Sequence, residues 1–184
     1  TQFGYVNDVM KTSVTWDGTA QTLRKSDSTY TGVEGFEKAN ITQNYDSIGS
    51  TVKTNTRFTY STVDVMTLST TYLGTANTLT RSITTYFGPE GFEKALRTDN
   101  YNSGGTGVKT NTTFSYTNDV LKISYTYDGT AQTLKKSETY YKNTEGFEKA
   151  DYTWNYNSGG TAVKTNTQFG YVNDVMKTSV TWDG

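Results

Sequence analysis

The pentapeptide Gly-Phe-Glu-Lys-Ala occurs three times without variation, at Gly35–Ala39, Gly91–Ala95 and Gly146–Ala150. It sets an acid beside a base, and such groups can perform acid–base chemistry or recognise a charged ligand. In a strand, however, successive side chains point to opposite faces, so the adjacent Glu and Lys cannot pair with each other. We interpret the motif as a turn glycine, an aromatic anchor and charges that discourage wrong strand pairing, with a recognition ladder as the alternative.

The remaining carboxylates are scattered and lie mostly in expected turns, as do Asp8, Asp17, Asp46 and Asp64. Aspartate-rich turns can bind calcium, but the alternating acids and terminal Glu of a calcium loop are missing. Cysteine and histidine are absent, which excludes disulfides, zinc–thiolate sites, thiol catalysis and the usual proton shuttle near neutral pH. The sequence therefore predicts no catalytic, cofactor-binding or metal-binding residue, and a protein that is not an enzyme.

Threonine and tyrosine offer two other kinds of surface. Lys-Thr-Asn-Thr recurs at Lys53–Thr56, Lys109–Thr112 and Lys164–Thr167, and Thr-x-Thr rows on a flat sheet can suggest ice binding. We expect these threonines to be buried instead, because they share a face with Phe58 and Tyr60. Tyrosines could stack on sugar rings, but cross-strand aromatic ladders are the simpler interpretation.

Two asparagines, Asn40 and Asn111, begin Asn-x-Thr sequences of the kind that accepts a glycan. They occupy non-equivalent positions in the chain's internal repeat. We interpret both as coincidences in a chain rich in Thr and Asn.

The elements that position these residues belong to a repeat of about 55 residues. Thr1–Gly18 returns letter for letter as Thr167–Gly184, with two diverged copies between. We predict the end of a preceding repeat at 1–7, repeats at 8–63, 64–118 and 119–173, and the start of a fourth at 174–184. We expect the chain to be a window from a longer array. The tyrosines that mark one position in each copy, 55, 56 and 55 residues apart, are Tyr5, Tyr60, Tyr116 and Tyr171.

Composition bounds the class of protein. Hydrophobic residues make up 33% of the chain, below the ~45–50% usual in globular domains. The abundance of aromatic and β-branched residues favours strands over disorder. The net charge of −1, from interspersed charges, gives no basic stripe, so we expect no nucleic-acid partner. No apolar run approaches the ~18 residues of a membrane span.

Turn signals such as Asn7-Asp8 and Asp17-Gly18 divide each repeat into four segments that end on an aromatic residue. No window shows the 3.6-residue period of a helix. The pattern predicts four strands per repeat, recurring with the 55–56-residue period. In the first copy they lie near Val9–Trp16, Gln21–Tyr30, Phe36–Tyr45 and Thr51–Tyr60.

Alternation in two of the four strands predicts one buried and one wet face. In the fourth strand we expect Val52, Thr54, Thr56, Phe58 and Tyr60 to be buried, and Lys53, Asn55, Arg57 and Thr59 to be exposed. In the first strand, Met10, Thr12, Val14 and Trp16 share a face, as do Leu121, Ile123, Tyr125 and Tyr127 in the third copy. The second strand breaks its parity between Leu23 and Tyr30, so either both faces are partly covered or a bulge shifts the register.

Three sequence features carry a resemblance to a known family: Thr126–Gly129 (Thr-Tyr-Asp-Gly), Asn44–Gly49 (Asn-Tyr-Asp-Ser-Ile-Gly) and Phe58-Thr59-Tyr60. They resemble the tyrosine–aspartate (YD) repeats of large bacterial cell-surface and secreted proteins of the RHS type, which build wrapped β-sheet shells. The repeat here is shorter than the family's usual unit and lacks its Gly-Arg-Leu turn. The resemblance implies an extracellular repetitive β-protein.

Taken together, these features predict an all-β protein of tandem four-stranded repeats, forming an extended antiparallel meander or wound sheet, with a β-solenoid as the alternative. The predicted function is structural: a self-associating repeat subunit of an extracellular or cell-surface filament, fibre or sheath. The alternative function is an adhesin stalk or carbohydrate-binding repeat domain whose partners are surface glycans.

Overall fold

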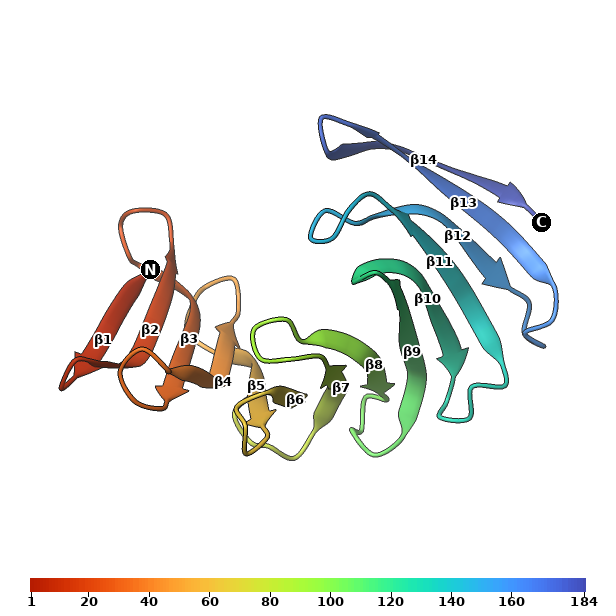
Figure 1. Cartoon of the computed structure of the whole chain (residues 1–184). Helices are drawn as coiled ribbons and strands as arrows, with labels where there is room; N and C mark the ends of the chain where they lie inside the picture. Colours follow the sequence, from red (N-terminus) through yellow and green to blue (C-terminus); the bar gives the residue numbers. More distant parts are fainter. The chain divides into compact units, whose positions relative to one another are not determined.

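The computed structural model describes residues 1–184 and contains fourteen strands and no helix (Figure 1). Strands that neighbour one another in the sheet also follow one another in sequence, and every described pair is antiparallel. The predicted all-β antiparallel meander is confirmed, and the β-solenoid alternative does not form. The strands are β1 (Gln2–Val6), β2 (Val9–Asp17), β3 (Leu23–Thr31), β4 (Lys38–Tyr45), β5 (Val52–Tyr60), β6 (Met66–Leu73), β7 (Thr80–Phe87), β8 (Lys94–Tyr101), β9 (Val108–Thr117), β10 (Val120–Asp128), β11 (Lys135–Lys142), β12 (Lys149–Tyr156), β13 (Val163–Val172) and β14 (Val175–Asp183).

The predicted strands of the first repeat are found within about two residues at each end. The turns between them use the residues that the sequence marked. Asn7 and Asp8 have φ of 49° and 64°, as a two-residue hairpin turn between twisted strands requires. The same pair of positive φ angles recurs at Asn118-Asp119 and at Asn173-Asp174.

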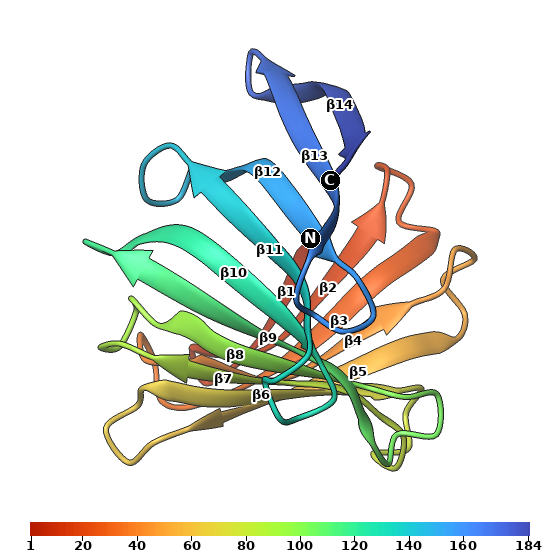
Figure 2. The same ribbon diagram turned by 90° about the vertical axis from the view of Figure 1, so that its right-hand side faces the viewer.

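The chain divides into two compact units, each of which is a single layer of strands (Figures 1 and 2). Unit 1 comprises Thr1–Lys94 with Tyr101–Thr106, and unit 2 comprises Ala95–Asn100 with Gly107–Gly184. Within each unit, strands contact only their neighbours in sequence. No hydrophobic side chain of the chain is fully buried. A sheet normally buries one face against a second layer, so these units are stabilised without the usual core.

The buried side chains are instead polar, and they define the two faces of each layer. Serines mark one face, called here the serine face: Ser13, Ser69 and Ser124 are each less than a tenth exposed. The asparagine face is marked by the equivalent residues Asn55, Asn111 and Asn166. Asn55 is 2% exposed and Asn111 is 0% exposed. The prediction that Asn55 lies on a wet face is wrong, because the loop after β6 covers it.

For the other residues of β5, the difference in burial between the two faces is smaller than the alternation predicted. Phe58 and Tyr60 lie on the serine face and are half-buried, and Lys53, Arg57 and Thr59 are exposed. Without a second layer, even the apolar side of β5 keeps access to water. The ordering of burial was therefore predicted correctly, but full burial was not.

Every described strand pair contains a bulge or other register shift. In β2 the shift falls at Lys11, so that Met10 stands opposite Tyr5 while Thr12 stands opposite Gly4. Met10 therefore does not share a face with Thr12, Val14 and Trp16, and Leu121 is separated from Ile123 in the same way. The sequence showed a break in alternation between Leu23 and Tyr30, and this break is also a bulge. Trp16 pairs with Arg24 but Thr15 pairs with Ser26, so the extra residue lies in β3.

Candidate functional site

The glutamate of the repeated pentapeptide caps a backbone N–H two strands away. Glu37 Oε1 accepts a hydrogen bond from the Met10 N–H at 2.9 Å. Met10 lies beyond the last β2–β3 register pair, Thr12–Thr29, so strand pairing does not satisfy its N–H. The same contact joins Glu93 to Met66 at 2.9 Å and Glu148 to Leu121 at 3.1 Å. These backbone hydrogen bonds hold the pKa of Glu37 and of Glu93 below the usual value.

The lysine of the motif reaches in the other direction. Lys38 Nζ lies 2.9 Å from the carbonyl oxygen of Asp64, 3.3 Å from its carboxylate and 2.7 Å from Glu90 Oε1. Lys149 makes the equivalent contacts with Asp174, at 3.1 Å to the carbonyl and 2.6 Å to the carboxylate. Burial alone lowers the pKa of Lys38, but the bonds to Glu90 and Asp64 outweigh it and raise the pKa. The glutamate therefore holds two elements of one repeat together, and the lysine ties its repeat to the next one.

This arrangement corrects the interpretation of the motif. Its charges do more than discourage wrong pairing, because they form specific bonds between strands that are 26 to 52 residues apart. The partner Glu90 was not singled out by sequence reasoning. A signal was present, since an acid precedes the motif's glycine in every copy, at Glu34, Glu90 and Glu145.

The phenylalanine of the motif makes no comparable internal contact. Phe36, Phe92 and Phe147 are 67%, 69% and 69% exposed. In unit 1, Phe36 borders a cavity of about 290 Å³ together with Val33, Lys38 and Tyr60. The predicted aromatic anchor is thus an exposed apolar group that recurs once per repeat.

Most tyrosines on the serine face are structural. Tyr30 bonds through its hydroxyl to Ser13 Oγ at 3.0 Å, and the bond recurs at Tyr86–Ser69 and Tyr141–Ser124. Two more donate to backbone carbonyls, Tyr60 to Ala39 at 2.9 Å and Tyr116 to Ala95 at 3.0 Å. Their hydroxyls are thereby occupied within the sheet. These tyrosines are therefore held by hydroxyl bonds to serines and carbonyls rather than by the predicted aromatic ladders.

The threonines of the serine face form rows across the strands, in pairs that hydrogen-bond to each other. Thr56 and Thr71 hydroxyls are 2.9 Å apart, and Ser28 and Thr42 hydroxyls are 2.8 Å apart. Unit 2 repeats this at Thr139–Thr153 and Thr167–Thr181. They are half-buried or exposed rather than fully buried, contrary to the expectation. Because the hydroxyls bond to one another in a twisted sheet, they do not present a regular flat array to ice.

The buried asparagines anchor loops. Asn111 Nδ2 donates to the Gly129 carbonyl at 2.6 Å, and Asn55 Nδ2 donates to Asn77 Oδ1 at 2.7 Å. The Oδ1 atoms of Asn55, Asn111 and Asn166 are buried without a partner. Because Asn111 is fully buried inside β9, it cannot carry a glycan in the folded chain, and the Asn-x-Thr pattern there is a coincidence.

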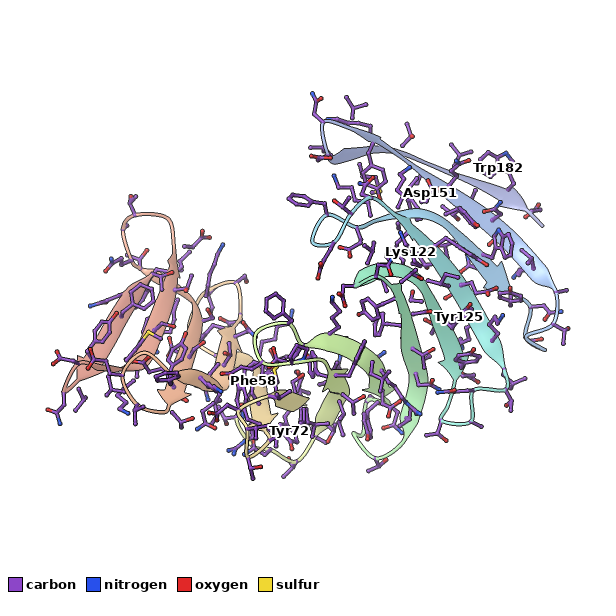
Figure 3. All side chains as sticks on the ribbon, in the orientation of Figure 1. Phe58, Tyr72, Lys122, Tyr125, Asp151 and Trp182 are labelled. Atoms are coloured by element: carbon purple, nitrogen blue, oxygen red, sulfur yellow. The ribbon has the colours of Figure 1, made fainter.

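One part of the asparagine face in unit 2 is aromatic. Two register rows cross strands β10 to β14 there, the first through Tyr125, Glu138, Trp154, Asn166 and Trp182, and the second through Ile123, Tyr140, Tyr152, Gln168 and Val180. Figure 3 labels Tyr125 and Trp182, which stand at the two ends of the first row. We call Tyr125, Tyr140, Tyr152, Trp154 and Trp182 the aromatic band.

The rings in the middle of the band contact each other. Tyr140 and Tyr152 are stacked with centroids 4.4 Å apart, and Trp154 lies 5.4 Å and 5.6 Å from them. Beside them Glu138, which is 6% exposed, accepts a hydrogen bond from the Tyr156 hydroxyl and pairs with Lys135 at 3.2 Å. Burial and the bond to Glu138 raise the pKa of Tyr156. The band is therefore a packed cluster with a charged, hydrogen-bonded edge.

No group of three or more acidic side chains is placed where it could hold a metal ion. Asp8, Asp17, Asp46 and Asp64 lie in or beside turns; Asp46 accepts the Ser50 N–H, and Asp64 pairs with Lys38. The structure also has no helix that is long and apolar enough to cross a membrane.

No family model matches the chain, and a search of characterised proteins found no match.

Proposed function

We propose that the chain is a structural repeat protein that self-associates into an extracellular or cell-surface filament, fibre or sheath, and that it has no enzymatic activity. The observation that carries this proposal is the single-layer architecture: no hydrophobic side chain is fully buried, so the apolar surface that a second layer would cover is available to other chains.

The contacts within the repeat support a structural role. The Lys38–Asp64 and Lys38–Glu90 bonds connect one repeat to the next, the Glu37–Met10 bond joins two elements of one repeat, and equivalents recur along the chain. Interactions of this kind give a nearly one-dimensional array, in which each repeat is stabilised by its neighbours. Length can then grow by adding repeats without a new core.

The exposed phenylalanines support self-association. A side chain that is two-thirds exposed contributes little to the stability of its own chain, yet Phe36, Phe92 and Phe147 stand in unvaried motifs. Phe36 lines an open cavity together with Tyr60 and Val33, so an apolar side chain from a second copy would meet apolar atoms there. The net charge of −1 offers little repulsion against association.

The test is to image purified protein by negative-stain microscopy and to measure its sedimentation. The variant F36S/F92S/F147S is expected to remain folded but to lose assembly. The matched control F36L/F92L/F147L keeps an apolar side chain at each position and is expected to assemble. A wild-type protein that is strictly monomeric at all concentrations would overturn the proposal. A serine variant that assembles normally would show that the phenylalanines are not the assembly contacts.

A further inference from the structure

The three rings in the middle of the aromatic band do not recur with the repeat, although the position of Trp182 is aromatic in every copy. The positions of Tyr140, Tyr152 and Trp154 are taken by Thr29, Ile41 and Gln43 in the first repeat and by Thr85, Arg97 and Asp99 in the second. By contrast, the Phe-Glu-Lys motif is unvaried. A contact that assembles an array must be present in every repeat, whereas the cluster of Tyr140, Tyr152 and Trp154 is present once in the chain. The band therefore serves a different purpose from assembly.

The chemistry of the band combines ring faces with hydrogen-bonding groups. The rings of Tyr140, Tyr152 and Trp154 are partly exposed, and Trp182 is 49% exposed. Beside them lie the exposed Gln168 amide and Asn166, whose Oδ1 is buried without a partner, while the buried Glu138 carboxylate is held by Tyr156 and Lys135. Aromatic residues with such neighbours suit ligands that are apolar on one side and wet on the other.

We propose that the aromatic band binds a saccharide chain. A pyranose ring has an apolar face of C–H groups that stacks on an aromatic ring, and hydroxyls at its rim that can pair with an exposed amide such as that of Gln168. Tyr125 and Trp182 are four strands apart, which is about 19 Å at the usual strand spacing. That length accommodates a short oligosaccharide rather than a single sugar.

The charges of the band disfavour a nucleic acid, the other ligand that stacks on aromatic rings. Platforms for single-stranded nucleic acid combine the rings with a positively charged groove. Here Lys135 is paired with Glu138, and its ammonium lies 5.3 Å from the Tyr125 ring and 5.0 Å from the Tyr156 ring. The exposed Gln168 amide, which is left for a ligand, is neutral and suits sugar hydroxyls.

The test is affinity electrophoresis of the full chain in gels that contain mixed-linkage β-glucan, xylan, galactomannan or glycol chitin. At least one polysaccharide is expected to retard the wild type. The variant Y140T/Y152I/W154Q installs the residues of the first repeat on an equivalent backbone, so it is expected to fold. Its apparent affinity for the polysaccharide, measured from the retardation, is expected to fall at least tenfold. The converse variant, T29Y/I41Y/Q43W, is expected to bind more tightly than the wild type.

F3S, which changes an exposed aromatic residue of β1 away from both the band and the Phe-Glu-Lys motif, serves as the control and is expected to bind normally. A wild type that is not retarded by any of the four polysaccharides, or a triple variant that binds as the wild type does, overturns the proposal. Sedimentation that shows the triple variant losing a dimer would mark the band as a protein interface and would also overturn it. Self-assembly is tested separately by electron microscopy. Failure of saccharide binding would therefore leave the proposed filament function standing, and failure of assembly would leave saccharide binding standing.

Discussion

Asn111 provides the most direct test of whether buried polar side chains stabilise this single-layer sheet. Its side chain is 0% exposed, and its only described bond is donated to the Gly129 carbonyl at 2.6 Å. We predict that Asn111→Ala removes this bond and leaves a buried carbonyl without a donor, at a cost of about 1–3 kcal/mol. In a domain of this size, a loss of about 2 kcal/mol lowers Tm by about 4–8 °C.

Asn111→Asp is nearly isosteric but replaces the donor with a carboxylate that faces a carbonyl oxygen. At neutral pH this puts an uncompensated charge in a buried site, which costs about 3–5 kcal/mol. Protonation restores a donor toward Gly129, so the pKa of the introduced acid is raised in the folded state. Stability relative to the wild type is therefore expected to recover as the pH falls through that raised pKa, the opposite of an acid whose folded pKa is lowered.

The assay is urea unfolding followed by circular dichroism at pH 7 and at pH 4, with hydrogen exchange to locate the loss in the β10–β11 loop. Asn118→Asp is the control, because Asn118 is exposed in a turn at φ 48°, a conformation that Asp tolerates. If Asn111→Asp is as stable as Asn118→Asp at pH 7, or if its stability does not recover in acid, the argument for a buried polar anchor fails.

Three further predictions concern charge, faces and assembly. Since the pKa values of Glu37 and Glu93 are lowered on folding, their contribution is present above the unfolded pKa and is lost as the pH falls; E37Q/E93Q/E148Q is expected to show a shallower loss of stability in acid, and parallel pH profiles would contradict this. Replacing half-buried Phe58 and Tyr60 with Ala is expected to lower the free energy of unfolding by about 1–3 kcal/mol, against about 0.5 or less for exposed Lys53 and Arg57, and equal shifts in urea midpoints would refute the face assignment. Filaments are expected to persist in EDTA, in reductant and from pH 5 to 8, because the chain has no Cys or His; dissolution by EDTA in electron micrographs would reveal a metal site.

The strands and turns could be predicted because they depend on local chemistry. Period-two alternation and turn pairs such as Asn7-Asp8 act within a few residues, and they placed the strands of the first repeat within about two residues. The antiparallel order followed from the short connections. None of this required knowledge of which residues stand opposite each other.

The features that sequence reasoning missed depend on register. The bulge at Lys11 moves Met10 to the other side of β2, and only the register shows it. Likewise, Lys38 finds Glu90 across 52 residues. The aromatic band also depends on register, since Tyr140 meets Tyr152 only through the β11–β12 pairing. One extra residue in a strand reverses alternation, so patterns within a strand could not reveal these contacts.

The single layer also explains how one chain can combine a fixed scaffold with a site that occurs once. In a packed core, changing Thr29, Ile41 and Gln43 to the larger rings of Tyr140, Tyr152 and Trp154 would overfill the space and strain the backbone. Here those side chains meet no second layer, so the backbone register is the same in both repeats. The repeated Glu and Lys bonds and the buried asparagines hold the strands, while other positions on the asparagine face, such as those of Tyr140, Tyr152 and Trp154, vary from copy to copy. A long array of this kind can therefore keep one architecture and display different surfaces along its length.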